Sequence, residues 1–434
     1  MMNQKKITLV SNDKVGTVMA GPGIRYFNLA IALAKHFAVT LFVPDSCDLT
    51  NSNFKIKVYN SRHSSTSIAR QLGSPDYIIA QSLNPFLLRK VKQKKIRYIA
   101  DLYDPQTIEI LEQAKYDTKS QQNNLFDFIY YTQALQIFAA DCILCSSEKQ
   151  KDLYIGMMAG QRVINPNLYR QSPDFQKYIQ LVPFGLSTDK PVAKNPDLVS
   201  NKFPQIKDAD KIIFWGGGIW NWFDPLSAIK AVENISKKRP DVKLVFLGVT
   251  HPNPKIDKMK IVEEAVEYCH KRDLLDKFVF FNFGWTPYEE RVDYLLRSSI
   301  GISTHLDNLE TRFSFRTRIL DYLWAELPII TTKGDSMADL VEIKNLGRVV
   351  DYRDISAIEN SILDLLDDKD EVYKIKNNIS LAKKEFEWDE IAKAIVQIIE
   401  TNHFPTRHRS HFQFLKLSFG FYLASLKKKL QYGK

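Results

Sequence analysis

The feature that most constrains the fold of this chain is a repeated alternation of short apolar runs with longer amphipathic segments. The runs lack the apolar–polar alternation of a half-exposed strand, which indicates strands buried on both faces, as in parallel sheets. Residues 24–37 are typical of the segments between them, with Tyr26, Leu29, Leu33 and Phe37 on one helical face. This rhythm predicts an α/β fold built from doubly wound parallel sheets. The predicted strands lie at 7–10, 39–43, 55–59, 77–80, 98–102, 142–145, 180–184, 212–215, 244–247, 278–281, 300–303, 329–331 and 348–350.

The length of the chain and a change in composition predict two domains. A chain of 434 residues exceeds the usual size of one domain. Residues 187–211 are rich in proline, lysine and aspartate and poor in large apolar residues, which is typical of a linker. We expect the cleft between two Rossmann-like domains to bind the ligand. The predicted parts are a first domain at 1–186, the linker, a second domain at 212–385, a closing helix at 386–400 and a tail at 401–434.

The distribution of charge argues against nucleic-acid binding. The chain has 60 Lys and Arg against 50 Asp and Glu, but residues 401–434 hold seven of the basic residues and no acid. The rest is therefore nearly neutral, whereas binding to nucleic-acid phosphates needs a broad basic face. Four cysteines in 434 residues do not form a disulfide scaffold and indicate a reducing compartment. Because no apolar run is long enough for a signal peptide or a membrane span, we expect a cytoplasmic protein.

The basic tail has the pattern of an amphipathic helix. Its apolar residues recur at helical spacing, at Phe412, Leu415, Phe419, Tyr422/Leu423, Leu426 and Leu430. One interpretation is that this apolar face packs on the protein body. The other is that residues 408–434 bind an anionic membrane surface on its cytoplasmic face, because basic amphipathic helices lie in that interface. The positive charge leads us to predict the membrane.

Two loops of the first domain could carry chemistry. The segment Gly21-Pro22-Gly23 joins the first strand to the first helix, and Gly21 and Gly23 would let a ligand approach the backbone at a helix N-terminus. It could equally be a tight turn without a ligand. Tyr103 and Asp104 follow the strand at 98–102, where a carboxylate could act as acid or base or could cap the next helix.

In the second domain, glycines and a histidine follow two successive strands. Gly216, Gly217 and Gly218 come between Trp215 and Trp220, a composition that suits a crevice for a ring and a phosphate. The alternative is a glycine turn with tryptophans packed in the core. His251 lies just beyond the strand at 244–247, at an edge where open α/β sheets bind ligands, although a lone histidine is often only a surface residue.

A cluster of charges follows the strand at 300–303. Arg312, Arg316 and Arg318 lie between Glu310 and Asp321. Arginine forks suit phosphate or carboxylate groups, and an aspartate on the following helix could hold a ribose diol. A solvated salt-bridge ladder would account for the same pattern, because Arg318 and Asp321 are neighbours on a helix.

Together these segments resemble the family 4 glycosyltransferases of the two-Rossmann (GT-B) architecture, as a divergent subgroup. The resemblance spans about residues 5–400 and is carried by GPGIRYFNLAIALAKHF at 21–37, LVPFG at 181–185, IIFWGGG at 212–218 and DYLWAELPIIT at 321–331. It implies retaining transfer of a sugar from a nucleotide-diphosphate sugar to a glycan or lipid-linked acceptor in surface polysaccharide biosynthesis. It also implies no cofactor and no catalytic metal, and the charge distribution already argues against a nucleic-acid partner. The first domain would bind the acceptor and the second the donor.

The resemblance assigns roles to individual residues and shows where this chain departs from the family. Asp321 takes the place of the second acid of the family's motif, which holds the ribose, whereas the position of the first acid is Phe313 and the nearest acid is Glu310. Tyr103 and Asp104 replace a first-domain His-Asp pair, so Glu310, Asp104 and Tyr103 are the catalytic candidates. The donor-site candidates are Gly21, Gly23, Gly216, Gly217, Gly218, His251, Arg312, Arg316, Arg318 and Asp321.

Two other functions fit the same sequence. A nucleotide-sugar epimerase of the same architecture would share the donor site and need no acceptor. A non-catalytic protein that binds a sugar nucleotide or polysaccharide would explain the missing first acid. Release of free nucleoside diphosphate in the presence of an acceptor separates the epimerase from a glycosyltransferase, and a donor-hydrolysis assay discriminates the non-catalytic protein.

Overall fold

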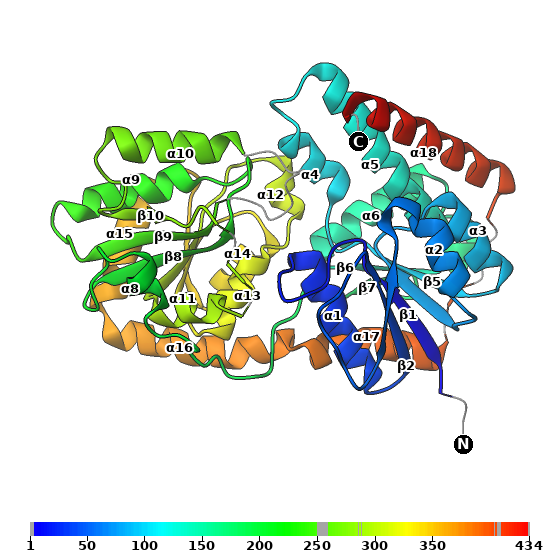
Figure 1. Ribbon diagram of the computed structural model, residues 1–434, viewed down its shortest axis with the longest axis horizontal. Helices are drawn as coiled ribbons and strands as arrows, with labels where there is room; N and C mark the ends of the chain where they lie inside the picture. Colours follow the sequence, from blue (N-terminus) through cyan, green and yellow to red (C-terminus); the bar gives the residue numbers. More distant parts are fainter. Residues whose placement is uncertain are drawn as a thin grey trace. The chain divides into compact units, whose positions relative to one another are not determined.

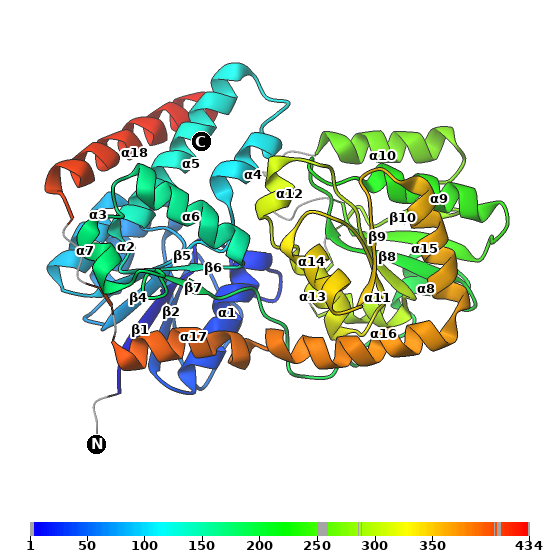
Figure 2. The same ribbon diagram turned by 180° about the vertical axis from the view of Figure 1, so that it is seen from behind.

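The computed structural model describes residues 4–249, 259–284, 286–287, 289–402, 404–405 and 409–432. They form two compact units, of which the first comprises Met1–Gly185 and Trp388–Lys434 and the second Leu186–Glu387. In each unit, helices cover a parallel sheet (Figures 1 and 2). The C-terminal segment therefore returns to the first unit after the second one is complete.

The first unit is built on a seven-stranded sheet in the order β3-β2-β1-β4-β5-β6-β7, and every pairing is parallel. The order reverses between β1 and β4, and in such sheets ligands bind beyond the carboxyl ends of the strands at the reversal. All four residues of β4 and of β6 are buried, as the unbroken apolar runs predicted. The strands are β1 (Lys6–Val10), β2 (Ala38–Pro44), β3 (Lys55–Tyr59), β4 (Tyr77–Ala80), β5 (Arg97–Asp101), β6 (Cys142–Cys145) and β7 (Ile179–Leu181).

The helices of the first unit include two from the end of the chain. Figure 1 shows α17 beside α1 and α18 along α5, and both pairs are in contact. The helices are α1 (Gly21–Ala34), α2 (Ser64–Gln71), α3 (Pro85–Gln93), α4 (Gln106–Gln113), α5 (Lys119–Ala139), α6 (Glu148–Gly160), α7 (Pro166–Gln171), α17 (Trp388–Thr401) and α18 (His411–Tyr432), with a 3-10 turn at Ser61–His63.

The second unit repeats the architecture with a six-stranded parallel sheet in the order β10-β9-β8-β11-β12-β13. Its order reverses between β8 and β11, so the segments that follow these two strands share one edge of the sheet. The strands are β8 (Lys211–Gly218), β9 (Val242–Gly248), β10 (Val279–Phe281), β11 (Ile300–Ser303), β12 (Ile329–Thr332) and β13 (Gly347–Val350).

Residues 187–211 belong to this second unit. They contain the short helix α8 (Leu198–Lys202), and their backbone is held by Asp293, whose carboxylate accepts hydrogen bonds from Lys194 N and Asn195 N. The other helices are α9 (Pro225–Ser236), α10 (Lys260–Lys271), α11 (Arg291–Arg297), α12 (Leu309–Phe313), α13 (Thr317–Trp324), α14 (Ser336–Ile343), α15 (Ile355–Asp367) and α16 (Lys369–Ala382), followed by a 3-10 turn at Lys383–Phe386.

Each predicted strand overlaps an observed one, and the α/β fold class is confirmed. The prediction of a turn at Gly21-Pro22-Gly23 was wrong, because these residues form the first turn of α1, where the fixed φ of Pro22 suits a helix start. The three glycines after Trp215 lie in the last part of β8 and not in a separate loop.

Among the described residues, no helix has the length and apolar character needed to cross a membrane.

Candidate active site

The glycine segment of the second unit is an irregular end of β8. The pairing of β8 with β9 shifts between Trp215 and Gly218, and Gly217 has a φ of +104° with open space around it. A residue with a side chain would be strained in that conformation. The N–H of Gly216 donates to the hydroxyl of Tyr322 at 2.9 Å, which ties the segment to α13. The backbone conformation at Gly217 therefore favours glycine, and the absence of a side chain leaves this segment accessible to a ligand.

Arg318, in the first turn of α13, is directed at this segment. Its Nη2 donates to the carbonyl oxygen of Gly218 at 2.7 Å, and its guanidinium lies 4.1 Å from the ring centre of Phe223 and 4.6 Å from that of Trp215. Burial lowers the pKa of Arg318 to about 10. Its Nη1 is also buried and, among the residues that the structure describes, has no hydrogen-bond partner. A buried charged donor without an acceptor is costly and suits an anionic ligand.

Arg316 and Glu310 are occupied with each other. The two guanidinium nitrogens Nη1 and Nη2 donate to the two carboxylate oxygens at 2.8 and 2.7 Å, and both side chains are buried. Nη2 also donates to the hydroxyl of Thr311 at 3.2 Å. Glu310 lies in α12 and Arg316 ends the three-residue connection to α13, so the pair ties this connection to the helix before it. Both residues were predicted to face the ligand, and the structure shows that they also form a hydrogen-bonded ion pair with each other.

Two further titratable residues in this cluster were not predicted. His305 lies just beyond β11, and its Nε2 is 3.0 Å from the carbonyl oxygen of Lys333 and 3.3 Å from Oδ2 of Asp335. Burial lowers the pKa of His305 far below its usual value, so the ring is neutral. Burial raises the pKa of Asp335 to about 6, although its Oδ1 caps α14 by accepting from two backbone N–H groups. Both residues follow closely after a predicted strand, and this position in the sequence could have identified them as candidates.

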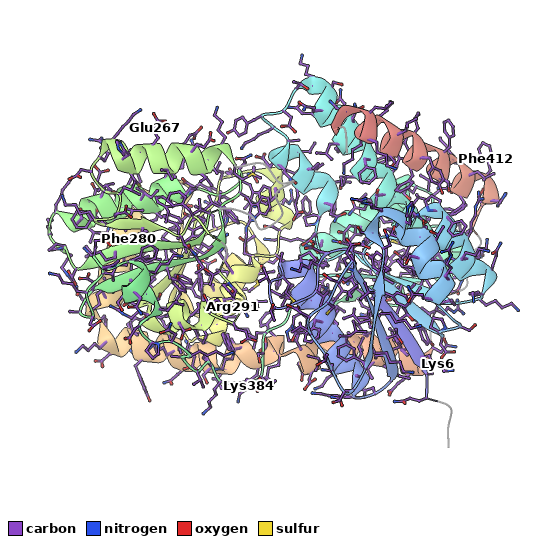
Figure 3. The ribbon with its side chains drawn as sticks, in the orientation of Figure 1. Lys6, Glu267, Phe280, Arg291, Lys384 and Phe412 are labelled. Atoms are coloured by element: carbon purple, nitrogen blue, oxygen red, sulfur yellow. The ribbon has the colours of Figure 1, made fainter. Side chains whose placement is uncertain are left out.

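Asp321 forms an ion pair that was also not predicted. Its Oδ1 lies 2.9 Å from Nη1 of Arg291 of α11, whose guanidinium lies 5.7 Å from the ring centre of Trp324. Figure 3 labels Arg291. Burial raises the pKa of Asp321, and Arg291 opposes that rise. The carboxylate is half-buried and retains a second oxygen for another partner. A ribose would therefore bind beside a carboxylate that is already oriented by an arginine.

The remaining donor-site candidates are placed differently. Arg312 is exposed and lies over Phe313, with its guanidinium 5.6 Å from the ring centre. His251 lies outside the described residues. Gly21 and Gly23 belong to the first unit, where Gly21 is open and Gly23 is packed under the carbonyl oxygen of Lys14. Close packing of the helix thus explains Gly23, while Gly21 leaves the N-terminus of α1 accessible.

In the first unit, Tyr103 and Asp104 follow β5. The side chain of Tyr103 is buried, and that of Asp104 is partly exposed, with Oδ2 3.4 Å from Nε2 of Gln81. Burial raises the pKa of Asp104 to about 7, although the nearby guanidinium of Arg25 opposes this rise. A carboxyl group with that pKa exchanges protons readily at neutral pH, which suits an acid or base. Asp104 does not cap α4, whose first residue has no side-chain cap.

Arg25 organises this region and was not predicted. Its Nε and Nη2 donate to the two oxygens of Asp101 at 2.8 and 2.7 Å, and both side chains are fully buried. The guanidinium also donates to the carbonyl oxygens of Val182 and Pro183 and lies 4.6 Å from the ring centre of Tyr103. It therefore joins α1, the end of β5 and the segment after β7. Arg25 stands within the 21–37 motif, but its partner is distant in sequence.

Among the described residues, no group of three or more His, Cys, Asp or Glu could hold a metal ion. The cations that the structure brings to the predicted donor site are arginines.

Two parallel sheets with Rossmann strand order, each with charged groups beyond its central strands, define the two-Rossmann GT-B class. Solved structures share this fold over most of the chain. Sucrose-phosphate synthase from Thermosynechococcus elongatus is 14% identical, with a TM-score of 0.62, over 92% of this chain and 99% of that chain. HepE from Anabaena, in complex with UDP and glucose, is 12% identical, with a TM-score of 0.63, over 92% and 100%. A glycosyltransferase from Rickettsia africae is 13% identical, with a TM-score of 0.61, over 92% and 98%.

The sequence itself matches one family. Residues 197–382 match the family model described as glycosyl transferases group 1. The matched part of the chain includes the Gly216–Gly218 segment and the Glu310–Asp321 cluster. The match and the fold confirm the resemblance to GT-B glycosyltransferases. No curated protein matches the chain.

Proposed function

We propose that this protein is a retaining glycosyltransferase that moves a sugar from a nucleotide-diphosphate sugar to a glycan or lipid-linked acceptor. The observation that carries the proposal is the buried Arg318, whose Nη1 has no partner among the described residues and whose Nη2 is bound to Gly218 at the open end of β8. The leaving group of such a reaction is a nucleoside diphosphate, on which negative charge grows. A preformed cation at that point stabilises the growing charge, and it does so without a resident metal.

The contacts favour Arg318 over Arg316 for the diphosphate. Arg316 already has both oxygens of Glu310 as acceptors, so a phosphate would compete with a buried carboxylate. Among the described residues, Arg318 has no carboxylate partner at hydrogen-bond distance, and its Nη2 is bound to the carbonyl oxygen of Gly218 in the open glycine segment. Asp321 would accept from the ribose hydroxyls, with Arg291 fixing its orientation. Asp104, with its pKa near 7, is the candidate for exchange of the acceptor hydroxyl proton.

The test is binding of nucleoside diphosphates to the full chain, measured by titration calorimetry. Loss of a charge-assisted contact costs about 1.5–3 kcal/mol, so Arg318→Ala should weaken binding by roughly 10- to 100-fold. Arg272→Ala is the matched control, because Arg272 is an exposed arginine of the same unit that is not a donor-site candidate, and it should bind like the wild type. Equal affinity of Arg318→Ala and the wild type would remove Arg318 from the site.

A second measurement separates the function from its alternatives. The full chain is incubated with UDP-, GDP- and dTDP-sugars and a set of glycan acceptors, and the products are followed by mass spectrometry. A glycosyltransferase forms a new glycoside as it releases nucleoside diphosphate, whereas an epimerase forms no glycoside with the acceptor. One alternative is a protein that binds the sugar nucleotide without transferring it. The ion pair of the catalytic candidate Glu310 with Arg316 favours this alternative, because the carboxylate already has a partner. Tight binding with no product from any donor would support that alternative and refute the transfer.

A further inference from the structure

Helix α18 packs on the first unit with the side opposite to the predicted apolar face. Leu417, Ser418 and Ala424 are buried, and Phe421 contacts Phe128 of α5 with ring centres 5.8 Å apart. At Gly420 a Cβ atom would fall 2.2 Å from the ring of Tyr131, so glycine allows the two helices to approach closely. The helix is therefore apolar on two sides, and only one of them is covered by the protein.

The other side of α18 is exposed, and we call it the outer strip. Figure 3 shows Phe412 at its start, pointing away from the domain, and its side chain is 78% exposed. Single exposed apolar residues are ordinary, but a row of seven on one helix marks a surface that binds something. The outer strip consists of Phe412, Leu415, Phe419, Tyr422, Leu423, Leu426 and Leu430, all at least 40% exposed.

Lysines border the outer strip on both sides. At about 100° per residue, Lys416 and Lys427 lie along one edge and Lys429 along the other. Lys428 instead faces the domain, with its Nζ 4.3 Å from the ring centre of Phe128. An apolar strip with cations at both edges matches a helix that lies in a membrane interface, where lysines reach the phosphates while the strip enters the acyl region. Cations on both edges favour an anionic surface over a neutral protein partner.

A pocket of about 950 Å³ opens at the first turn of α18. It lies at the amino ends of β5 and β6, between the last turns of α3 and α5, which is the opposite edge of the sheet from Asp104. Leu415 lines this pocket and also belongs to the outer strip, so the two surfaces are continuous. The pocket is lined by five basic residues and one acid, which are Arg89, Lys92, Lys95, Arg97, Arg409 and Asp141.

The charges of the pocket favour an anion. Asp141 is the only acid among its described lining residues, and it is used internally, because its Oδ1 lies 2.8 Å from Arg409 and 3.6 Å from Arg97. Arg409 also donates to the carbonyl oxygen of Ala140 at 2.8 Å, which fixes the start of α18 on the domain. Arg89, Lys92 and Lys95 remain as exposed cations at the opening, and Arg89 lies over Phe414 of α18.

We propose that the pocket binds the headgroup of an anionic phospholipid and that the outer strip inserts beside it into the same leaflet. The phosphate would be bound by Arg89, Lys92 and Lys95, while Leu415 and the rest of the strip contact the acyl chains. The site is distinct from the donor site and from Asp104. It stands independently of the proposed transfer reaction, although it would hold the enzyme where a lipid-linked acceptor is found.

The test is co-sedimentation of the full chain with vesicles of phosphatidylcholine alone or mixed with phosphatidylglycerol. We expect binding to the mixed vesicles and at least tenfold weaker binding to the neutral ones, with release at 0.5 M salt because charge attraction is screened. Truncation after Thr401 is a poor test, because it would also uncover α5. Substitutions at exposed positions leave the packing of α18 intact.

Two variants separate the parts of the surface. Lys92→Glu/Lys95→Glu should reduce binding to mixed vesicles about tenfold or more, and Phe419→Ser/Leu426→Ser should reduce binding to both vesicle types. The matched controls in the second unit are Lys237→Glu/Lys238→Glu and Ile343→Ser/Leu381→Ser, which change equally exposed residues and should bind like the wild type.

Three results would overturn the proposal: no vesicle binding by the wild type, equal binding to neutral and anionic vesicles, or wild-type binding by both variants. Light scattering completes the test. A wild-type dimer that becomes monomeric in Phe419→Ser/Leu426→Ser, without vesicle binding, would show that the strip is a protein interface instead.

Discussion

Both units place an arginine–carboxylate fork beyond the carboxyl ends of their central strands, but the two forks join very different lengths of chain. In the first unit, Arg25 and Asp101 are 76 residues apart, and the fork links two elements of the domain. In the second, Arg316 and Glu310 are six residues apart, and the fork closes a local connection. The first pair is fully enclosed, whereas the second retains slight exposure. We infer that the first fork holds the fold of its domain and the second shapes a ligand loop.

The largest effect is expected from breaking the enclosed fork. Arg25→Met leaves the carboxylate of Asp101 buried without its cation, which should lower the free energy of unfolding by about 3–5 kcal/mol. Arg316→Met should cost less, because this fork lies within one local segment and is not fully enclosed, so the short helix α12 that carries Glu310 can move toward water. Urea unfolding followed by circular dichroism measures both. Equal losses would show that chain separation does not distinguish the forks, and recovery in Arg25→Met/Asp101→Leu would identify the unpaired charge as the cause.

A smaller effect is expected from Asp104, and it depends on pH. Burial raises its pKa to about 7, so between pH 4 and 7 the folded protein holds a proton that the unfolded chain has released. The wild type therefore loses stability as the pH rises through this window. Asp104→Asn removes that loss. A rise of about 3 in pKa corresponds to at most about 4 kcal/mol, and partial solvation reduces it, so we expect the variant to gain about 1–3 kcal/mol at pH 8.

Unfolding at pH 4 and pH 8 is the measurement for Asp104. At pH 4 the two should differ by less than about 1 kcal/mol, because the carboxyl group is protonated in the folded protein and only about half ionised in the unfolded chain. A constant difference at both pH values would contradict the raised pKa. The same variant should lose transfer activity while it keeps the affinity for nucleoside diphosphate, since the donor contacts are in the other unit.

Tyr322 provides a smaller test of the second unit. Its hydroxyl accepts from Gly216 N–H and lies 3.0 and 2.8 Å from the carbonyl oxygens of Phe214 and Ile302. Tyr322→Phe keeps the ring but leaves the Gly216 N–H without its acceptor, which should cost about 1–2 kcal/mol of stability. Because the glycine segment is the proposed diphosphate site, the affinity for nucleoside diphosphate should fall as well. Unchanged affinity in a destabilised variant would separate the segment from the ligand.

The sequence predicted the elements better than the contacts between them. Strands such as 77–80 and 142–145 were found because they are buried on both faces and so read as unbroken apolar runs. The charges of 310–321 were found because they are close in sequence. Arg25 was missed because nothing local points to Asp101. In α18 the periodicity identified the apolar face correctly, but a second, smaller face of Leu417, Gly420 and Ala424 makes the contact with the domain.

The smallest effect is expected from an exposed pair in the same unit as the enclosed fork. Lys35 at the end of α1 lies 2.5 Å from Asp389 in the first turn of α17, and about half of each side chain is exposed. Because water solvates both charges, Lys35→Ala should change the unfolding free energy by less than about 1 kcal/mol, and salt should reduce the change further. Both pairs involve α1, so the experiment isolates burial from pairing. A loss comparable to that of Arg25→Met would mean that attachment of α17, and not enclosure of charge, sets the cost of breaking an ion pair in this domain.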